Sequence, residues 1–172
     1  MSKKMAKFQK VSFEQFKKDM IDTFNDTYSD EQIRQIYNYI KLPVRATTGS
    51  AGYDFVSPID FTLNAGESIQ FPTGIRCKMC ENWVLMIFPR SGLGFKYRAQ
   101  LDNTVGIIDS DYFYSDNEGN IGMKITNDSR ENKTLVVHSG DRIAQGVFVP
   151  FGITQDDNVN ESRTGGFGST GK

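Results

Sequence analysis

Short apolar runs, separated by glycine and proline, fill the chain from about residue 43 to residue 150. The separators are Gly49, Pro58, Gly66, Pro72, Gly74, Gly92, Gly119 and Gly140. This spacing is typical of many short strands joined by turns, because the intervals are too short to alternate strands with helices. We therefore expect a mainly β chain, folded as a compact sandwich or barrel. Strands are predicted over residues 54–56, 68–71, 83–88, 121–126, 134–137 and 143–150.

Residues 1–41 have a different pattern, which predicts two amphipathic helices. The first carries an apolar stripe at helical spacing, formed by Phe13, Phe16, Met20 and Phe24. The second begins with a capping box at Ser29 and Gln32, and its stripe is Ile33, Ile36, Tyr37 and Ile40. Pro43 marks its end. Two short helices bury little surface alone, so we expect them to pack on the main domain or on a protein partner.

Residues 156–172 are polar and then rich in glycine. Such a segment buries too little to order itself, so it is a flexible arm or folds over something else. Residues 166–172 match the spacing of a phosphate-binding loop, but that loop needs a preceding strand, a hydroxyl residue after the lysine and a following helix. We reject this motif. The predicted organisation is an extension (1–41), a β domain (42–155) and an arm (156–172).

The net charge of −1 and the 38% of hydrophobic residues are ordinary for a globular protein. Nucleic-acid binding normally needs a clear basic excess, so this function is not expected. Lys3, Lys4, Lys7 and Lys10 are basic locally, but a basic terminus is usually solvated. No apolar run resembles a signal-peptide core or a membrane span. We expect a cytoplasmic protein without a membrane partner.

Cys77 and Cys80 have the C-x-x-C spacing of zinc and redox sites. A structural zinc site needs four ligands, and His138 is the single histidine available to complete one. A redox pair normally opens a helix, whereas these cysteines lie between two predicted strands. Residues three apart on a strand point to opposite faces. We therefore expect reduced structural cysteines, and a strand-end position for His138.

Two acids follow the apolar residues Val105, Ile107 and Ile108. Burying a carboxylate without a partner is costly, so an acid in this position needs a reason, and site chemistry is the commonest one. The alternative is that Asp109 and Asp111 begin a turn. The pattern alone does not choose between the two acids.

Two further segments combine polar residues with glycine. Arg90 and Ser91 stand at a glycine-permitted turn, where a guanidinium fork suits phosphate, although a plain surface turn has the same composition. Gln145 lies among small and apolar residues where a strand begins. Its amide needs hydrogen-bond partners, which backbone groups or a ligand can supply.

These segments gain meaning from their order along the chain. They are Ala51-Gly-Tyr-Asp54-Phe, Arg90-Ser-Gly-Leu-Gly94, Asn103 to Tyr112 with Asp109, Gly140-Asp-Arg-Ile-Ala-Gln145 and Gly165-Gly-Phe-Gly-Ser-Thr-Gly171. Together they resemble the conserved motifs of the homotrimeric dUTPase family, and the resemblance spans about residues 42–172. It implies a jelly-roll-like β-barrel and trimers with active sites at subunit junctions. It also implies hydrolysis of dUTP to dUMP and pyrophosphate with Mg²⁺.

The resemblance implies a role for each matching residue. Asp109 would be the general base that activates water, and Tyr112 would pack on the deoxyribose and exclude a ribose 2′-hydroxyl. Asp54 would support the site indirectly. The remaining substrate contacts would come from Arg90, Ser91, Gly92, Asn103, Gly106, Ile107, Ile108, Gly122, Gln145, Arg163, Phe167, Gly168 and Ser169. Asn103, Gly106 to Ile108 and Gly122 would read uracil, and Phe167 would cap it. The others would hold phosphate, with Mg²⁺ on the phosphates rather than on protein ligands.

The chain departs from the family pattern in three places. Residues 113–118 are an insertion after Tyr112, Arg163 stands one position closer than usual to the following glycine pair, and residues 1–41 lie outside the common core. A related activity on the same fold, deamination of dCTP, needs an acid–base glutamate near the base-reading hairpin. Glu118 is the candidate there, and its position in the insertion makes it a poor one.

Overall fold

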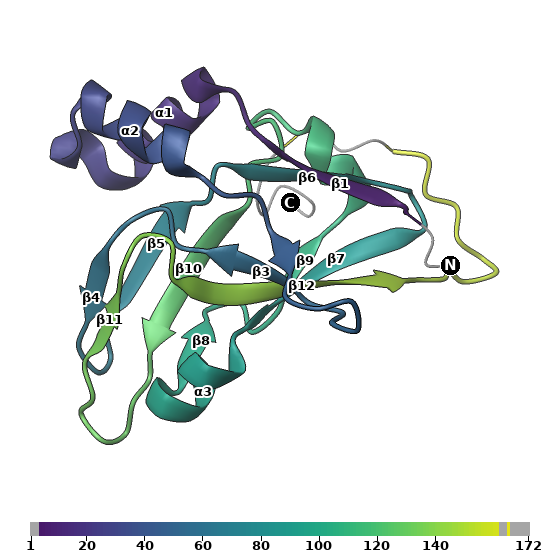
Figure 1. The fold of residues 1–172 in the computed structure, drawn as a ribbon. Coiled ribbons are helices and arrows are strands. Elements are labelled where there is room, and N and C mark those ends of the chain that lie inside the picture. The colour runs from purple at the N-terminus through teal and green to yellow at the C-terminus, as the bar shows by residue number, and fades with distance from the viewer. Residues whose placement is uncertain (1–3, 162–164, 166–172) are drawn as a thin grey trace.

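The computed structural model describes residues 4–161 and 165, and it is mainly β, as predicted (Figure 1). The largest sheet has the strand order β2 (Val44–Arg45), β3 (Tyr53–Val56), β12 (Arg142–Pro150), β7 (Trp83–Pro89) and β9 (Gly106–Ile108). A second sheet has the order β5 (Ser68–Pro72), β10 (Gly122–Asn127) and β8 (Ala99–Leu101). Two strand pairs complete the fold, β4 (Phe61–Leu63) with β11 (Leu135–Val137), and β1 (Ala6–Lys10) with β6 (Ile75–Met79). Within the described ranges these sheets remain separate and close no barrel.

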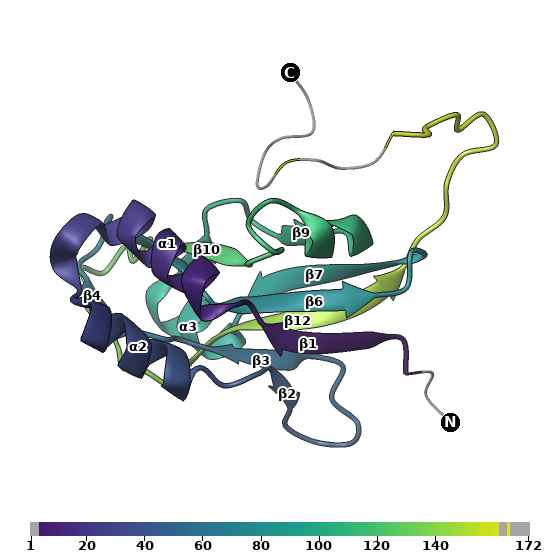
Figure 2. The same cartoon turned by 90° about the horizontal axis from the view of Figure 1, so that it is seen from above.

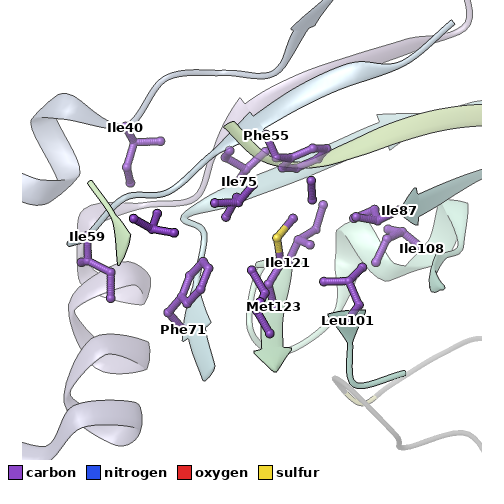
Figure 3. Packing of buried hydrophobic residues seen from close by; sticks show 14 of the residues in the cluster. Ile40, Phe55, Ile59, Phe71, Ile75, Ile87, Leu101, Ile108, Ile121 and Met123 are labelled. Carbon is purple, nitrogen blue, oxygen red and sulfur yellow. The ribbon is translucent and has the colours of Figure 1, made fainter. Parts of the chain in front are cut away.

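The core is built by alternation along these strands. In β4 and β11 the outer residues are buried and the middle one is exposed, as the two-residue period of a strand requires. Phe55, Phe71, Ile75 and Ile121 are fully buried and point into one apolar interior (Figure 3). The strands predicted from sequence correspond to β3, β5, β7, β10, β11 and β12.

The extension contains the two predicted helices, α1 (Phe13–Phe24) and α2 (Asp30–Tyr39), joined by the 3-10 turn η1 (Asn25–Thr27). The predicted capping box of Ser29 and Gln32 is present at the start of α2. Phe16, Met20 and Ile33 are almost completely buried and belong to the same core cluster as the sheets. The apolar stripes therefore pack on the chain's own β domain (Figure 1).

Helical structure was the wrong prediction for residues 6–10, which form strand β1. Phe8 packs edge-on against Phe55 with ring centroids 5.7 Å apart, and it also contacts Tyr53 and Phe148. β1 pairs antiparallel with β6 from Ala6 opposite Met79 to Lys10 opposite Ile75. The pairing partner lies far along the chain, so local periodicity did not reveal it.

Cys77 is buried, Cys80 is exposed, and both are free thiols, as predicted. Burial raises the pKa of the Cys77 thiol to about 12, so it stays protonated and unreactive at neutral pH. His138 directly follows β11. Within residues 4–161 and 165, every helix is too short or too polar to span a lipid bilayer.

Candidate active site

A cavity of about 360 Å³ lies between β9, β10, β5 and α1. Its lining includes the sequence-predicted residues Asn103, Gly106, Ile108, Tyr112 and Gly122. The apolar part comes from core side chains, namely Phe71, Ile87, Leu101 and Met123 (Figure 3). The Ile107 side chain is 53% exposed because its neighbours on β9 point inward. Only the backbone of Ile107 is therefore available on the cavity side of the strand.

Strand β9 is suited to contacting a ligand through its backbone. It is the edge strand of its sheet and pairs with β7, whereas β10 pairs with β5 and β8. On the edge away from β7, the β9 backbone pairs with no other strand of the described residues. A Cβ added at Gly106 would lie 3.3 Å from the Ile87 Cβ, so a larger residue would push on the cavity lining. Residues of β9 and β10 line the same cavity.

Asp109 follows β9 directly and occupies the N-cap position of the short 3-10 helix η2 (Ser110–Tyr114). Its backbone is extended and its side chain is half-buried, whereas Asp111, two residues later, is exposed. Asp109 is therefore the acid held against the end of the buried strand.

Tyr112 is only 4% exposed, and its ring borders the cavity. Its hydroxyl donates to the Asn120 carbonyl oxygen at 2.8 Å and accepts from the Asn117 Nδ2 at 2.9 Å. Because the protein engages the hydroxyl on both sides, the ring face is the part of Tyr112 that a ligand in the cavity meets.

Arg90 lies at the end of β7, in contact with Asp54. Its Nη1 donates to Asp54 Oδ1 at 2.8 Å, and the Arg142 Nη1 lies 3.3 Å from the other carboxylate oxygen. Gln145 stands directly opposite Asp54 in the pairing of β12 with β3. A Cβ at Gly52 would lie 2.9 Å from the Gln145 Oε1, so the Gly52 backbone and the Gln145 side chain approach each other closely. Three of the predicted motifs therefore meet at this point.

The segment after Arg90 corrects a prediction. It was expected to be a turn, but Ser91 begins the helix α3 (Ser91–Tyr97). The glycines at positions 92 and 94 lower helix propensity and led to the turn prediction. Ser91 and Gly92 are exposed in the first turn of α3, beside Arg90.

Asp109 and Arg90 are far apart within one chain. In the antiparallel pairing of β7 with β9, Leu85 is opposite Ile108 and Ile87 is opposite Gly106. Asp109 therefore lies level with Val84, and Arg90 is six residue steps further along β7, about 20 Å away. A single copy does not bring these two predicted site residues together.

Arg163, Phe167, Gly168 and Ser169 lie outside the described residues, so their predicted contacts stay predictions. Within residues 4–161 and 165, no three His, Cys, Asp or Glu side chains come together as a metal site.

The insertion at residues 113–118 holds the N-terminal extension. The Glu118 carboxylate accepts from the Ser12 backbone N–H and from the Ser12 hydroxyl, each at 2.7 Å. Arg76 donates to the Phe113 carbonyl at 2.8 Å and stacks on the Phe113 ring. Glu118 therefore anchors the start of α1 and is not among the residues lining the cavity, which removes support for its proposed part in deamination.

This anchor is expected to weaken in acid. Burial alone raises the pKa of Glu118, but the two hydrogen bonds from Ser12 and the nearby Arg76 lower it below its usual value overall. A lowered pKa in the folded state stabilises the fold above the unfolded pKa of about 4.3. That stabilisation is lost as the pH falls through the folded pKa. The melting-temperature difference between the wild type and Glu118→Gln should be constant near neutral pH and shrink below about pH 4.

Glu81→Gln is the matched control, because Glu81 is exposed in the turn between β6 and β7. Its melting temperature should equal that of the wild type at every pH. If the melting temperatures of the Glu118 and Glu81 variants coincide over the pH range, the anchoring role is contradicted.

Sequence reasoning missed the contribution of α1 to the cavity. Asp19, Asp22 and Thr23 line it together with Asn117 and Asn120 of the insertion region. No motif marks these residues, because the wall forms only when segments about a hundred positions apart come together.

Comparisons with known proteins identify the family of this chain. Residues 38–171 match the model of the dUTPase family. The deoxyuridine 5'-triphosphate nucleotidohydrolase of Lactococcus lactis is 41% identical over 135 residues, covering 77% of this chain and 89% of the relative.

Two solved structures are also similar. The dUTPase of Streptococcus mutans has a TM-score of 0.62 and 32% identity, covering 86% of this chain and 97% of that one. A mutant dUTPase from phage phi11 of S. aureus, described with a coordinated structural Mg(II) ion, has a TM-score of 0.58 and 25% identity and covers 70% of this chain and 90% of that one. The chain therefore belongs to the dUTPase family and is an enzyme of that class.

Proposed function

We propose that this protein hydrolyses dUTP to dUMP and pyrophosphate, with Asp109 as the general base. Asp109 takes a proton from water, whose oxygen forms a bond to the α-phosphorus. The bond from that phosphorus to the α–β bridging oxygen breaks, and pyrophosphate leaves. The observation that carries the proposal is the cavity, which is lined by predicted base- and sugar-contacting residues and borders the strand that Asp109 directly follows.

The cavity supports uracil as the base. Backbone groups from Gly106 to Ile108 can pair with the polar edge of uracil, and Asn103 adds an amide at the same opening. Gly122 of β10 lines the same cavity. Close approach of the base to the β9 backbone would leave little room for the 5-methyl group of thymine. The Tyr112 ring would pack on the deoxyribose, where a 2′-hydroxyl would collide with it.

The distance between Asp109 and Arg90 supports sites shared between copies, and the family resemblance makes a homotrimer the proposed assembly. One copy would supply the cavity and Asp109, while a second would supply Arg90, Ser91, Gly92 and Gln145 for the phosphates. The ion pair with Asp54 would hold the Arg90 guanidinium in place, because a fixed donor fork loses less freedom when it binds phosphate. Positioning and charge neutralisation are most of what phosphoryl transfer needs from a protein.

Magnesium would bind to the substrate phosphates rather than to a protein cage. The described residues offer no cluster of acids or histidines for it, and phosphate oxygens are suitable ligands for Mg²⁺. When bound, the ion would neutralise the charge that develops on the leaving group.

We further propose that the arm (156–172) closes over the substrate, with Phe167 on uracil and Arg163, Gly168 and Ser169 near the phosphates, which would exclude water.

The test is pyrophosphate release from dUTP, UTP, dTTP and dCTP in parallel, with and without a chelator. We expect rapid release from dUTP alone, and loss of that release when the chelator removes Mg²⁺. Ammonia is measured in the dCTP reaction. Equal rates on dUTP and UTP, or ammonia release from dCTP, would overturn the proposal.

A further inference from the structure

Helix α1 of the extension forms one wall of the nucleoside cavity. Helix α1 packs against α2 and β5, and Figure 2 shows it beside α2. Asp19 and Thr23 of this helix line the same cavity as Tyr112 and Gly122. The helix is fixed there by burial of Phe16 and Met20 on its inner face and by the Ser12–Glu118 contact at its start. A segment outside the conserved motifs is therefore part of the substrate pocket.

Asp19 is connected to the insertion region through Asn120. Its Oδ2 accepts from the Asn120 Nδ2 at 2.6 Å, and its Oδ1 accepts from Gln15 at 2.8 Å. At the other end of the Asn120 amide, Oδ1 accepts from the Gly74 backbone N–H at 2.9 Å. Asn120 is only 3% exposed, so both ends of a buried amide are held. Removing Asp19 leaves the Asn120 donor without this partner, and a buried donor left unpaired favours rearrangement.

Asn120 in turn holds Tyr112. The backbone carbonyl of Asn120 is the acceptor for the Tyr112 hydroxyl, and the Asn117 amide contacts both of these groups. Asp19 on α1 is thus linked to the tyrosine at the cavity through Asn120, whose side chain binds the acid and whose backbone carbonyl binds the tyrosine. Burial raises the pKa of the Asp19 carboxyl, while its hydrogen bonds from Asn120 and Gln15 lower it, so this acid is held partly out of water.

We infer that Asp19 is a positioning residue that sets the selectivity for deoxyribose, by holding Asn120 and through it the ring of Tyr112. The inference rests on the proposed function, in which that ring excludes the ribose 2′-hydroxyl. Exclusion by contact requires a ring that does not move aside, because a ring with freedom to retreat admits the extra hydroxyl. The extension therefore acts on specificity from outside the conserved motifs.

The experiment compares kcat/KM for dUTP and UTP in the wild type, Asp19→Ala, Asp19→Asn and Glu14→Ala. Alanine is well tolerated in a helix, so Asp19→Ala should fold. We expect its dUTP-to-UTP ratio to fall about tenfold or more, since small displacements of positioning groups have effects of this size. Asp19→Asn keeps an oxygen that accepts from Asn120 and should retain most of the selectivity. Glu14→Ala removes the same charge from the exposed face of α1 and should match the wild type.

Thermal unfolding of each variant separates positioning from stability. A fall in selectivity of Asp19→Ala at temperatures where it is fully folded, with rescue by Asp19→Asn, supports the inference. If the wild type is selective and Asp19→Ala keeps that selectivity, the positioning role is wrong while the proposed function stands. If the wild type releases no pyrophosphate from dUTP, the proposed function itself fails.

Discussion

Asp109→Asn should reduce dUTP hydrolysis by about a thousandfold, within the range that general bases contribute. Asparagine has nearly the same shape as aspartate, but it has no basic oxygen to take a proton from water. Binding should persist, because the proposed base- and sugar-contacting residues line a cavity that does not include Asp109. The measurements are pyrophosphate release and the affinity for a dUTP analogue with a non-hydrolysable α–β bridge.

Asp111→Asn is the matched control for this variant. It removes the same charge two positions away, from an exposed residue of η2. It should hydrolyse dUTP at close to the wild-type rate. Equal activities in the two variants would refute the assignment of Asp109, and a large loss of analogue affinity in Asp109→Asn would point to a role in binding instead.

Phe16→Ala should destabilise the whole protein by about 3–5 kcal/mol, the usual cost of removing a fully buried phenylalanine side chain. Phe16 is 0% exposed, and its ring lies 5.7 Å from that of Tyr37. It also packs close to Gly74, where an added Cβ would come within 3.0 Å of the ring. The cavity left behind would lie between the extension and the β domain. The measurement is urea unfolding followed by Trp83 fluorescence and by circular dichroism.

Ile21→Ala on the same helix is the control, because Ile21 is 36% exposed. Its loss of stability should be well below that of Phe16→Ala. If both variants unfold at the wild-type urea concentration, α1 is not part of the core, and the hypothesis that the extension docks on a protein partner regains support.

Local patterns were enough to predict the elements whose side chains alternate or repeat regularly. The stripe of Phe16 and Met20 and the capping box at Ser29 depend on neighbours within one helical turn, and the structure contains them. Strand β1 was missed because Ala6 to Lys10 is short and polar, and it is a strand through its pairing with β6. Helix α3 was missed because glycine is a weak helix former, so tertiary context decided its conformation.

The residues of the candidate site likewise include some that local patterns predict and others that only the fold reveals. Motif order pointed to Asn103, Gly106 and Tyr112, and the structure places them around one cavity. Nothing in the sequence indicated that Asp19 would line that cavity, since its contact with Asn120 joins positions 101 residues apart. Residues whose role depends on such a contact have no local signature.

The same long-range contacts determine when the apolar side chains of the extension become buried during synthesis. α1 leaves the ribosome early, but Glu118, which binds Ser12, follows 106 residues later. Until then Phe16 and Met20 have no complete partner surface, and exposed apolar faces of this kind favour aggregation. At about 5–20 residues per second, elongation leaves the nascent helix uncovered for several seconds. Production of the full-length protein should therefore respond to chaperone supply and growth temperature.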